Sequence, residues 1–252
     1  MLGKMSQGGL LPHVLTAFSG GRVLDVATGH GDFAFALARN LAGYDEIIGI
    51  DTNEKELETA REAAKQQLLN RVRFFARDAE ELGFEDASFD TVTISNSLHH
   101  MKSPGTVLSG MRRVLRPGGL FIVREMYRDK QNKAQMSHVL FHTFRADIDT
   151  LKGITHRKSY LRDELYQMYQ GLGLSSLEVF DVGPEDIEPP IDPMDNDNIE
   201  HLVQMVDTML EHPADYNRDQ TFKVRGQELK NYFRTNGFLP ATSLVAIGRK
   251  PG

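Results

Sequence analysis

The stretch VLDVATGHGDFA, from Val23 to Ala34, decides the fold of this 252-residue chain. An apolar strand leads into a turn that contains Gly29 and Gly31, and an alanine-rich helical pattern follows at once. Glycine adds no Cβ at such a turn, so the backbone N–H groups at the start of the helix can approach a bound ligand closely. The segment therefore predicts a site for a nucleotide-like cofactor.

The second segment, EIIGID at Glu46 to Asp51, reads as a short buried strand that ends in a carboxylate. In a βαβ unit, the tip of the second strand lies within reach of ribose hydroxyls. The spacing of Gly29, Gly31 and Ala34 also fits the G-x-G-x-x-G/A pattern of dinucleotide-binding proteins. Both NAD and adenosyl cofactors carry a ribose, so these two segments leave the cofactor open.

Three further segments continue the pattern. RFFARDAE, ending at Glu80, places Asp78 and Ala79 after a third strand, where a carboxylate can accept from the exocyclic amine of adenine and the next N–H can donate to a ring nitrogen. FDTVTISNSLHHM at 89–101 and LRPGGLFIVREMY at 115–127 read as two more strands with an amphipathic helix between them.

Together the five segments, across core residues 21–127, resemble the class I S-adenosylmethionine-dependent methyltransferases. The glycine segment is similar to that of the small-molecule type, which includes the ubiquinone and menaquinone C-methyltransferases. The resemblance implies an α/β, Rossmann-like, doubly wound seven-stranded sheet whose last strand, about 242–247, is antiparallel between the fifth and sixth. It also implies a single methyltransferase domain over 1–252, with helical lid insertions at about 129–153 and about 183–237 that select the acceptor.

The resemblance further implies S-adenosylmethionine as the cofactor. Asp25 would hold the amine of its methionine part, Asp51 its ribose and Asp78 its adenine. The complete set of cofactor-binding residues implied in this way is Asp25, Thr28, Gly29, Gly31, Asp51, Thr52, Asp78, Ala79 and Asn96.

The implied reaction is in-line displacement, in which a nucleophile on a small-molecule acceptor attacks the sulfonium methyl group. Proximity and alignment can supply most of the acceleration, with one base to remove a proton from the acceptor. Histidine is the usual base near neutral pH, and His100 follows the fourth strand at the rim where cofactor and acceptor should meet. The alternative for His100 is a packing role at that rim.

In the first insertion, His138, His142, Arg145 and Asp149 are spaced so that they share one face of a helix. Three interpretations stay open: a solvated polar face, histidines that line the acceptor pocket, and a metal site completed by a ligand from elsewhere. No metal is assigned at this point. The catalytic candidates are His100, His138 and His142, and the substrate-side candidates are Glu125, Tyr127, Arg145 and His156.

Composition limits the classes of function. The net charge of −6 argues against a nucleic-acid partner, and the absence of cysteine excludes disulfides and thiolate metal sites. No apolar stretch is long enough to span a bilayer, and Met1 to Gly20 lacks a signal-peptide pattern, so we expect a cytoplasmic protein without a membrane partner.

Two other functions remain as alternatives. An NAD-dependent oxidoreductase would explain the glycine pattern and Asp51, but it gives no role to Asp25 or to the pair Asp78–Ala79. A non-catalytic protein that binds an adenosyl cofactor would keep the fold and lack the chemistry, because function resides in sites and not in folds.

Overall fold

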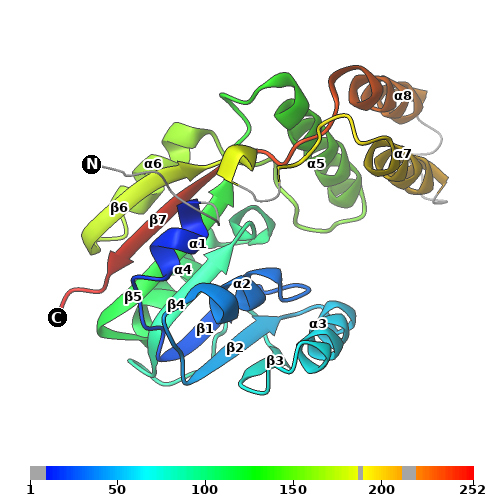
Figure 1. The fold of residues 1–252 in the computed structure, drawn as a ribbon. Helices are drawn as coiled ribbons and strands as arrows, with labels where there is room; N and C mark the ends of the chain where they lie inside the picture. The colour runs from blue at the N-terminus through cyan, green and yellow to red at the C-terminus, as the bar shows by residue number, and fades with distance from the viewer. Residues whose placement is uncertain (1–9, 187–189, 212–219) are drawn as a thin grey trace.

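A seven-stranded sheet runs through the protein in the order β3-β2-β1-β4-β5-β7-β6 (Figure 1). The computed structural model describes residues 10–186, 190–211 and 220–252. Strand β7 is antiparallel to both β5 and β6, and the other neighbouring pairs are parallel. This confirms the expected seven-stranded sheet with its antiparallel last strand between the fifth and sixth. The strands are β1 Arg22–Val26, β2 Glu46–Asp51, β3 Val72–Ala76, β4 Phe89–Ser95, β5 Leu115–Met126, β6 Ser175–Val182 and β7 Ser243–Arg249.

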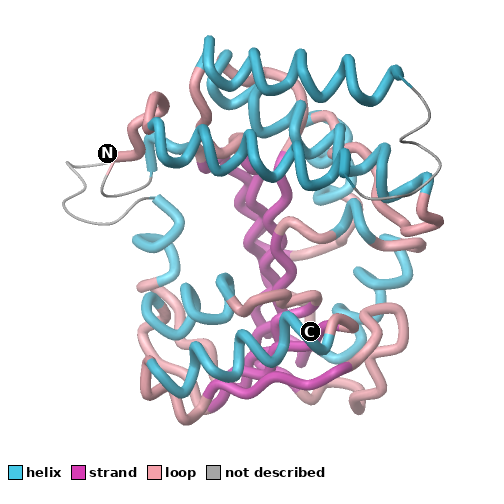
Figure 2. Tube along the Cα trace, turned by 90° about the vertical axis from the view of Figure 1, so that its right-hand side faces the viewer, coloured by secondary structure: helices cyan, strands magenta, loops and turns pink. Residues whose placement is uncertain are grey.

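Helices cover both faces of this sheet, and Figure 2 shows the strands at the centre of the molecule with helices around them. Among the described residues, none of the helices has the length and apolar character that crossing a membrane requires. The α-helices are α1 Leu10–Leu15, α2 Asp32–Asn40, α3 Glu54–Gln66, α4 Pro104–Val114, α5 Lys133–Leu151, α6 Arg162–Gln170, α7 Asn196–Glu211 and α8 Gln220–Asn236, and the short 3₁₀ helices are η1 Leu98–His100 and η2 Pro184–Asp186.

Successive residues of the central strands pack into two separate cores. Val23 of β1 packs with α1, α2 and α3, whereas its neighbour Leu24 packs with α4 and α6 on the other face. Side chains alternate between the faces of a strand, and a parallel sheet covered on both faces must bury both sets. The nearly continuous burial along β1, β2 and β4 is therefore a direct consequence of the two helical layers.

The helices α5, α7 and α8 form a third cluster beyond the carboxyl ends of the parallel strands (Figure 1). Their buried face includes Phe141, Phe144 and Phe233, with the Phe141 and Phe233 rings 6.0 Å apart. A capping box between Asn132 and Gln135 starts α5. These helices, called the helical cap below, fall within the two segments that the sequence indicates as insertions.

We expect Phe233→Ala to destabilise the protein by about 3–5 kcal/mol, because it leaves a cavity among fully buried aromatic rings. Val224→Ala is the matched control: it lies on the same helix with a side chain that is 56% exposed, and it should change the free energy of unfolding by less than about 0.5 kcal/mol. Urea unfolding of both variants measures the difference. Equal stability of the two would show that α8 does not depend on this contact.

Candidate functional site

The glycine turn between β1 and α2 adopts a backbone that requires glycine. Gly29 and Gly31 have positive φ angles of 53° and 85°. A Cβ on Gly31 would lie 2.8 Å from the ring of Phe74. The Gly29 N–H donates to Oδ2 of Asp51 at 2.9 Å, so the turn is fixed to the end of β2. Helix α2 begins directly after Gly31 without a side-chain cap, which leaves its first N–H groups facing the strand ends.

Asp25 lies behind this turn and is almost fully buried. Its two carboxylate oxygens accept hydrogen bonds from the hydroxyl groups of Thr28 and Thr93, both at 2.6 Å. Burial raises the pKa of Asp25 to about 6, although the two hydroxyl donors act in the opposite direction. Asp25 therefore ties the glycine turn to β4 from the buried side of the turn.

Asp51 is partly exposed at the end of β2 and faces the glycine turn. Its other oxygen, Oδ1, accepts from the N–H of Asn53 at 2.9 Å, and Asn53 caps α3 by accepting from the N–H of Glu56. Thr52 between them is exposed. A carboxylate has about four acceptor positions, so two remain for the hydroxyl groups of a ligand.

The ends of β3 and β4 complete the same edge of the sheet. After β3, Asp78 is exposed and accepts from the N–H of Glu80 at 2.8 Å, and Ala79 is buried. After β4, Asn96 has a φ of 49°, and its side-chain carbonyl accepts from the N–H of Met126. The structure thus brings the proposed cofactor residues of four strand ends to one edge, where parallel α/β sheets bind ligands.

Glu125 lies near the end of β5, as the sequence predicts, but it is buried and does not face an acceptor pocket. Strand β5 continues to Met126 beside β7, which makes Glu125 an interior position of the sheet, with no exposed surface. Its carboxylate accepts from the N–H of Leu98 at 2.7 Å and pairs with Nδ1 of His99 at 2.8 Å. Glu125 therefore orients η1 and His99 and does not itself face an acceptor.

Tyr127 is also buried rather than open to an acceptor pocket. Burial raises its pKa to about 12, and the nearby carboxyl group of Asp181 on β6 acts in the same direction. The side chain thus turns toward β6. Tyr127 follows directly after β5, where its N–H donates to the carbonyl of Thr242 and the chain of Tyr160 lies alongside.

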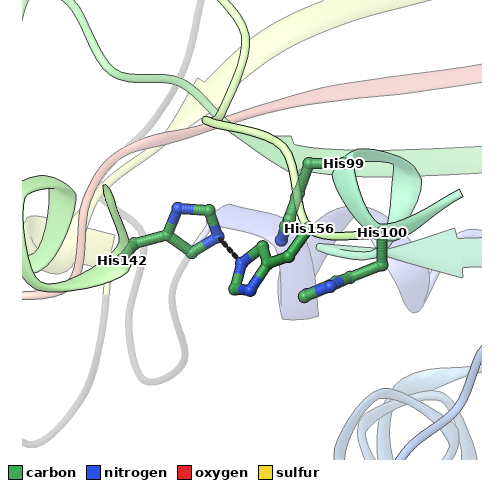
Figure 3. Close-up of side chains that lie close together, drawn as sticks. All are labelled: His99, His100, His142 and His156. Atoms are coloured by element: carbon green, nitrogen blue, oxygen red, sulfur yellow. Dashed lines mark hydrogen bonds between the residues drawn. The ribbon is translucent and has the colours of Figure 1, made fainter. Parts of the chain in front are cut away.

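Four histidines gather beside the end of β4 (Figure 3). His99 and His100 come from η1, His142 from α5, and His156 from the segment between α5 and α6. One ring nitrogen from each lies within 4.8 Å of the others. We call these four residues the histidine cluster. It adjoins the glycine turn, since the hydroxyl of Ser97 donates to the carbonyl of Ala27 at 3.2 Å.

The sequence predicts that His138, His142 and Arg145 share one face of a helix, but in the structure these three side chains have different surroundings. His142 enters the histidine cluster, whereas Nδ1 of His138 accepts from the N–H of Ala241 at 2.9 Å, next to Phe238. Arg145 is exposed and lies 3.7 Å from Asp149. Because His138 and His142 are partly buried and contact other segments, a fully solvated face is not what forms.

Two members of this site carry roles that sequence reasoning did not assign. His99 is buried against Glu125, and Asp149 pairs with Nδ1 of His156 at 2.7 Å. The adjacent histidines at 99 and 100 were a visible signal, but their division into one buried and one exposed ring depends on Glu125. The Asp149–His156 pair forms only because the chain turns back after α5.

Comparison with known proteins agrees with this geometry. A family model described as "Methyltransferase domain" matches residues 17–171, more than half of the chain. A demethylmenaquinone methyltransferase from Geobacillus kaustophilus is 32% identical over 174 residues, which cover 64% of this chain and 73% of the relative. For several other curated relatives, the chain spans about half of their length or less.

Solved structures share the fold at low sequence identity. The [4+2]-cyclase SpnF has a TM-score of 0.61 at 21% identity, covering 96% of this chain and 79% of that one. A phosphoethanolamine N-methyltransferase 2 of Haemonchus contortus, in complex with phosphomonomethylethanolamine and S-adenosylhomocysteine, has a TM-score of 0.57 at 20% identity, covering 93% and 50%.

The chain belongs to the methyltransferase domain family. Within that family it is an S-adenosylmethionine-dependent methyltransferase of the Rossmann-like type. The matched range ends before β6, so α7, α8 and the last two strands lie outside it.

The raised pKa of Asp25 predicts a pH-dependent cost to stability. The folded protein binds the proton of Asp25 more tightly than the unfolded chain does. The contribution of Asp25 to the free energy of unfolding therefore falls as pH rises from about 4 to about 6, and it stays low above that pH. Asp25→Asn removes this dependence. The free energy of unfolding of Asp25→Asn, relative to that of wild type, should rise by about 2 kcal/mol when the pH is changed from about 4.5 to about 7.5.

Urea unfolding of both proteins at the two pH values measures this gain. Asn96→Asp would add a carboxyl group at an exposed position and serves as a control for general charge effects. A constant difference between wild type and Asp25→Asn across the range would contradict the raised pKa.

Proposed function

We propose that this protein transfers the methyl group of S-adenosylmethionine to a small-molecule acceptor by in-line displacement. The observation that carries the proposal is the bond between the Gly29 N–H and the Asp51 carboxylate, at the edge where β1 and β2 end side by side. That arrangement gives an open turn for the methionine part of the cofactor and a fixed carboxylate for its ribose.

In this proposal the remaining cofactor contacts follow the order of the strands. Asp78 and the N–H of Ala79 read the adenine, Thr52 flanks it, and Asn96 lies near the methionine amine. Asp25 acts through Thr28, because Asp25 is almost fully buried and accepts from the hydroxyl of Thr28. The sulfonium methyl would then point from the end of β4 toward the helical cap.

The acceptor would bind between that edge and the helical cap. His100 keeps an exposed edge there, while the partial burial of its ring, together with neighbouring histidines, lowers its pKa to about 3, so the ring is neutral at neutral pH. A base of such low pKa gives weak assistance, and alignment of the acceptor with the methyl group would supply most of the rate. His138 supports this pocket from behind through its contact with Ala241.

The class of acceptor is a small organic molecule. The name of the Geobacillus relative makes a demethylated quinone the first compound to assay. Residues of the helical cap would set the choice, and α7 and α8 lie outside the family match. A cytoplasmic location and the lack of a nucleic-acid partner belong to the same proposal, in keeping with the net charge of −6.

We expect Asp51→Ala to weaken binding of S-adenosylmethionine by about tenfold or more, because the variant loses both the ribose acceptor and the anchor of the glycine turn. Glu58→Ala on the exposed side of α3 removes a carboxylate without touching the turn, and its affinity should equal that of wild type. Calorimetry with S-adenosylmethionine and S-adenosylhomocysteine measures both variants.

The same calorimeter separates the proposal from the oxidoreductase alternative. Tight binding of NADH, with none of S-adenosylmethionine, would overturn the proposed function. Transfer of a radiolabelled methyl group to demethylated quinones and to a small-molecule extract then tests for catalysis. Cofactor binding without transfer to any compound in either set would favour the non-catalytic alternative.

A further inference from the structure

The histidine cluster brings four imidazole rings together from three separate segments of the chain (Figure 3). His99 and His156 are buried, His142 is partly buried, and His100 forms the exposed side. The Nε2 atoms of His142 and His156 lie 3.0 Å apart and form the hydrogen bond that the dashed line in Figure 3 marks. Rings so close, with nitrogens directed at one another, need a reason beyond packing.

Two of the rings are oriented by carboxylates on their outer side. Glu125 pairs with Nδ1 of His99 at 2.8 Å, and Asp149 pairs with Nδ1 of His156 at 2.7 Å. A carboxylate that accepts from Nδ1 fixes the proton on that nitrogen and leaves a lone pair on Nε2. Such carboxylate–histidine pairs are the usual outer support of histidines that bind metal ions.

The contact between His142 and His156 points the same way. With a lone pair on Nε2 of His156, the ring of His142 must donate from its own Nε2 to keep the 3.0 Å contact as a hydrogen bond. Nδ1 of His142 is then a buried acceptor, and within the described residues it has no hydrogen-bond partner. An ion bound at Nε2 of His142 would replace the contact with His156, and the ring would then carry its proton on Nδ1.

The charges around the cluster also suit a cation. The carboxylates of Glu125 and Asp149 lie directly behind two of the rings, where they favour a positive charge, and the exposed Arg145 is 3.7 Å from Asp149.

We propose that His99, His100, His142 and His156 bind one divalent transition-metal ion of the kind that prefers imidazole nitrogen, with Zn²⁺ as the reference ion. Nitrogens about 2.0–2.1 Å from a tetrahedral Zn²⁺ are about 3.3 Å from one another, so small ring movements convert the observed cluster into a coordination sphere. His138, which the sequence placed beside His142 as a ligand candidate, is not part of it, because its Nδ1 is taken by Ala241.

The ion would fasten α5 of the helical cap to η1 at the end of β4. Because His100 is the exposed ligand, its side of the ion is where an oxygen of the acceptor could take a coordination position. Only this last statement rests on the proposed methyl transfer. The metal site itself stands on the geometry of the four rings and their two carboxylates.

The test uses the full chain without an affinity tag, stripped of metal by a chelator and then titrated with Zn²⁺ or Co²⁺. We expect one equivalent to bind per chain, with the visible absorption of Co²⁺ in a nitrogen-ligated, four- or five-coordinate site. His142→Ala and His156→Ala should each weaken Zn²⁺ binding by about 100-fold or more. Asp149→Asn, which keeps the shape of the side chain, should weaken it by about tenfold to 100-fold.

His138→Ala is the matched control, one turn earlier on the same helix, and its Zn²⁺ affinity should equal that of wild type. Zn²⁺ should raise the melting temperature of wild type and of His138→Ala, and much less that of His142→Ala. Should a histidine variant fail to fold, Asp149→Asn and the Co²⁺ spectrum of wild type still decide the matter.

Failure of wild type to bind one equivalent of Zn²⁺, or equal affinity in His142→Ala and His138→Ala, would overturn the metal site. Calorimetry of S-adenosylmethionine on the same metal-free protein keeps the two proposals apart. Cofactor binding without metal binding would leave methyl transfer standing and remove the ion, and metal binding without cofactor binding would do the reverse.

Discussion

The hydrogen bond from the Gly29 N–H to the Asp51 carboxylate is the contact on which the cofactor half of the structure depends. It joins the turn after β1 to the end of β2, and it holds because the two strands run parallel in register from Arg22↔Glu46 to Val26↔Ile50. Gly29 and Gly31 adopt positive φ angles in this turn, and a Cβ on Gly31 would meet the ring of Phe74. From behind, the buried carboxylate of Asp25 fixes the same turn to β4, so three strand ends are set by two carboxylates.

Much of this half could be predicted from the sequence, because it depends on local patterns. Apolar runs that end in Asp51 and Asp78, with glycines between a strand and a helix, specify a parallel sheet and the edge where its ligands bind. The antiparallel place of β7 followed from resemblance to a family. Direct structural observation adds that Asp25 is enclosed by Thr28 and Thr93, a contact between residues far apart in the chain.

The acceptor half was much less predictable, because its contacts are long-range. Helical periodicity put His138 and His142 on one face, but the segment before β7 brings Ala241 to His138, and the segment between α5 and α6 brings His156 to His142. Glu125 was expected at a strand tip, and pairing with β7 buries it under His99. No local sequence pattern predicts that two carboxylates and four imidazoles from separate segments will lie together. Helix α5 of the helical cap lies within the family match, whereas α7 and α8 lie beyond it.

The central claim is that the carboxyl edge of β1, β2 and β3 holds an adenosyl cofactor whose sulfur faces the helical cap. A crystal structure of the complex with S-adenosylhomocysteine tests it most directly. The account predicts both ribose hydroxyls within hydrogen-bond distance of Asp51, adenine beside Asp78 and Ala79, and the sulfur nearest to the histidine cluster. A ligand bound anywhere else, or a ribose turned away from Asp51, would contradict it.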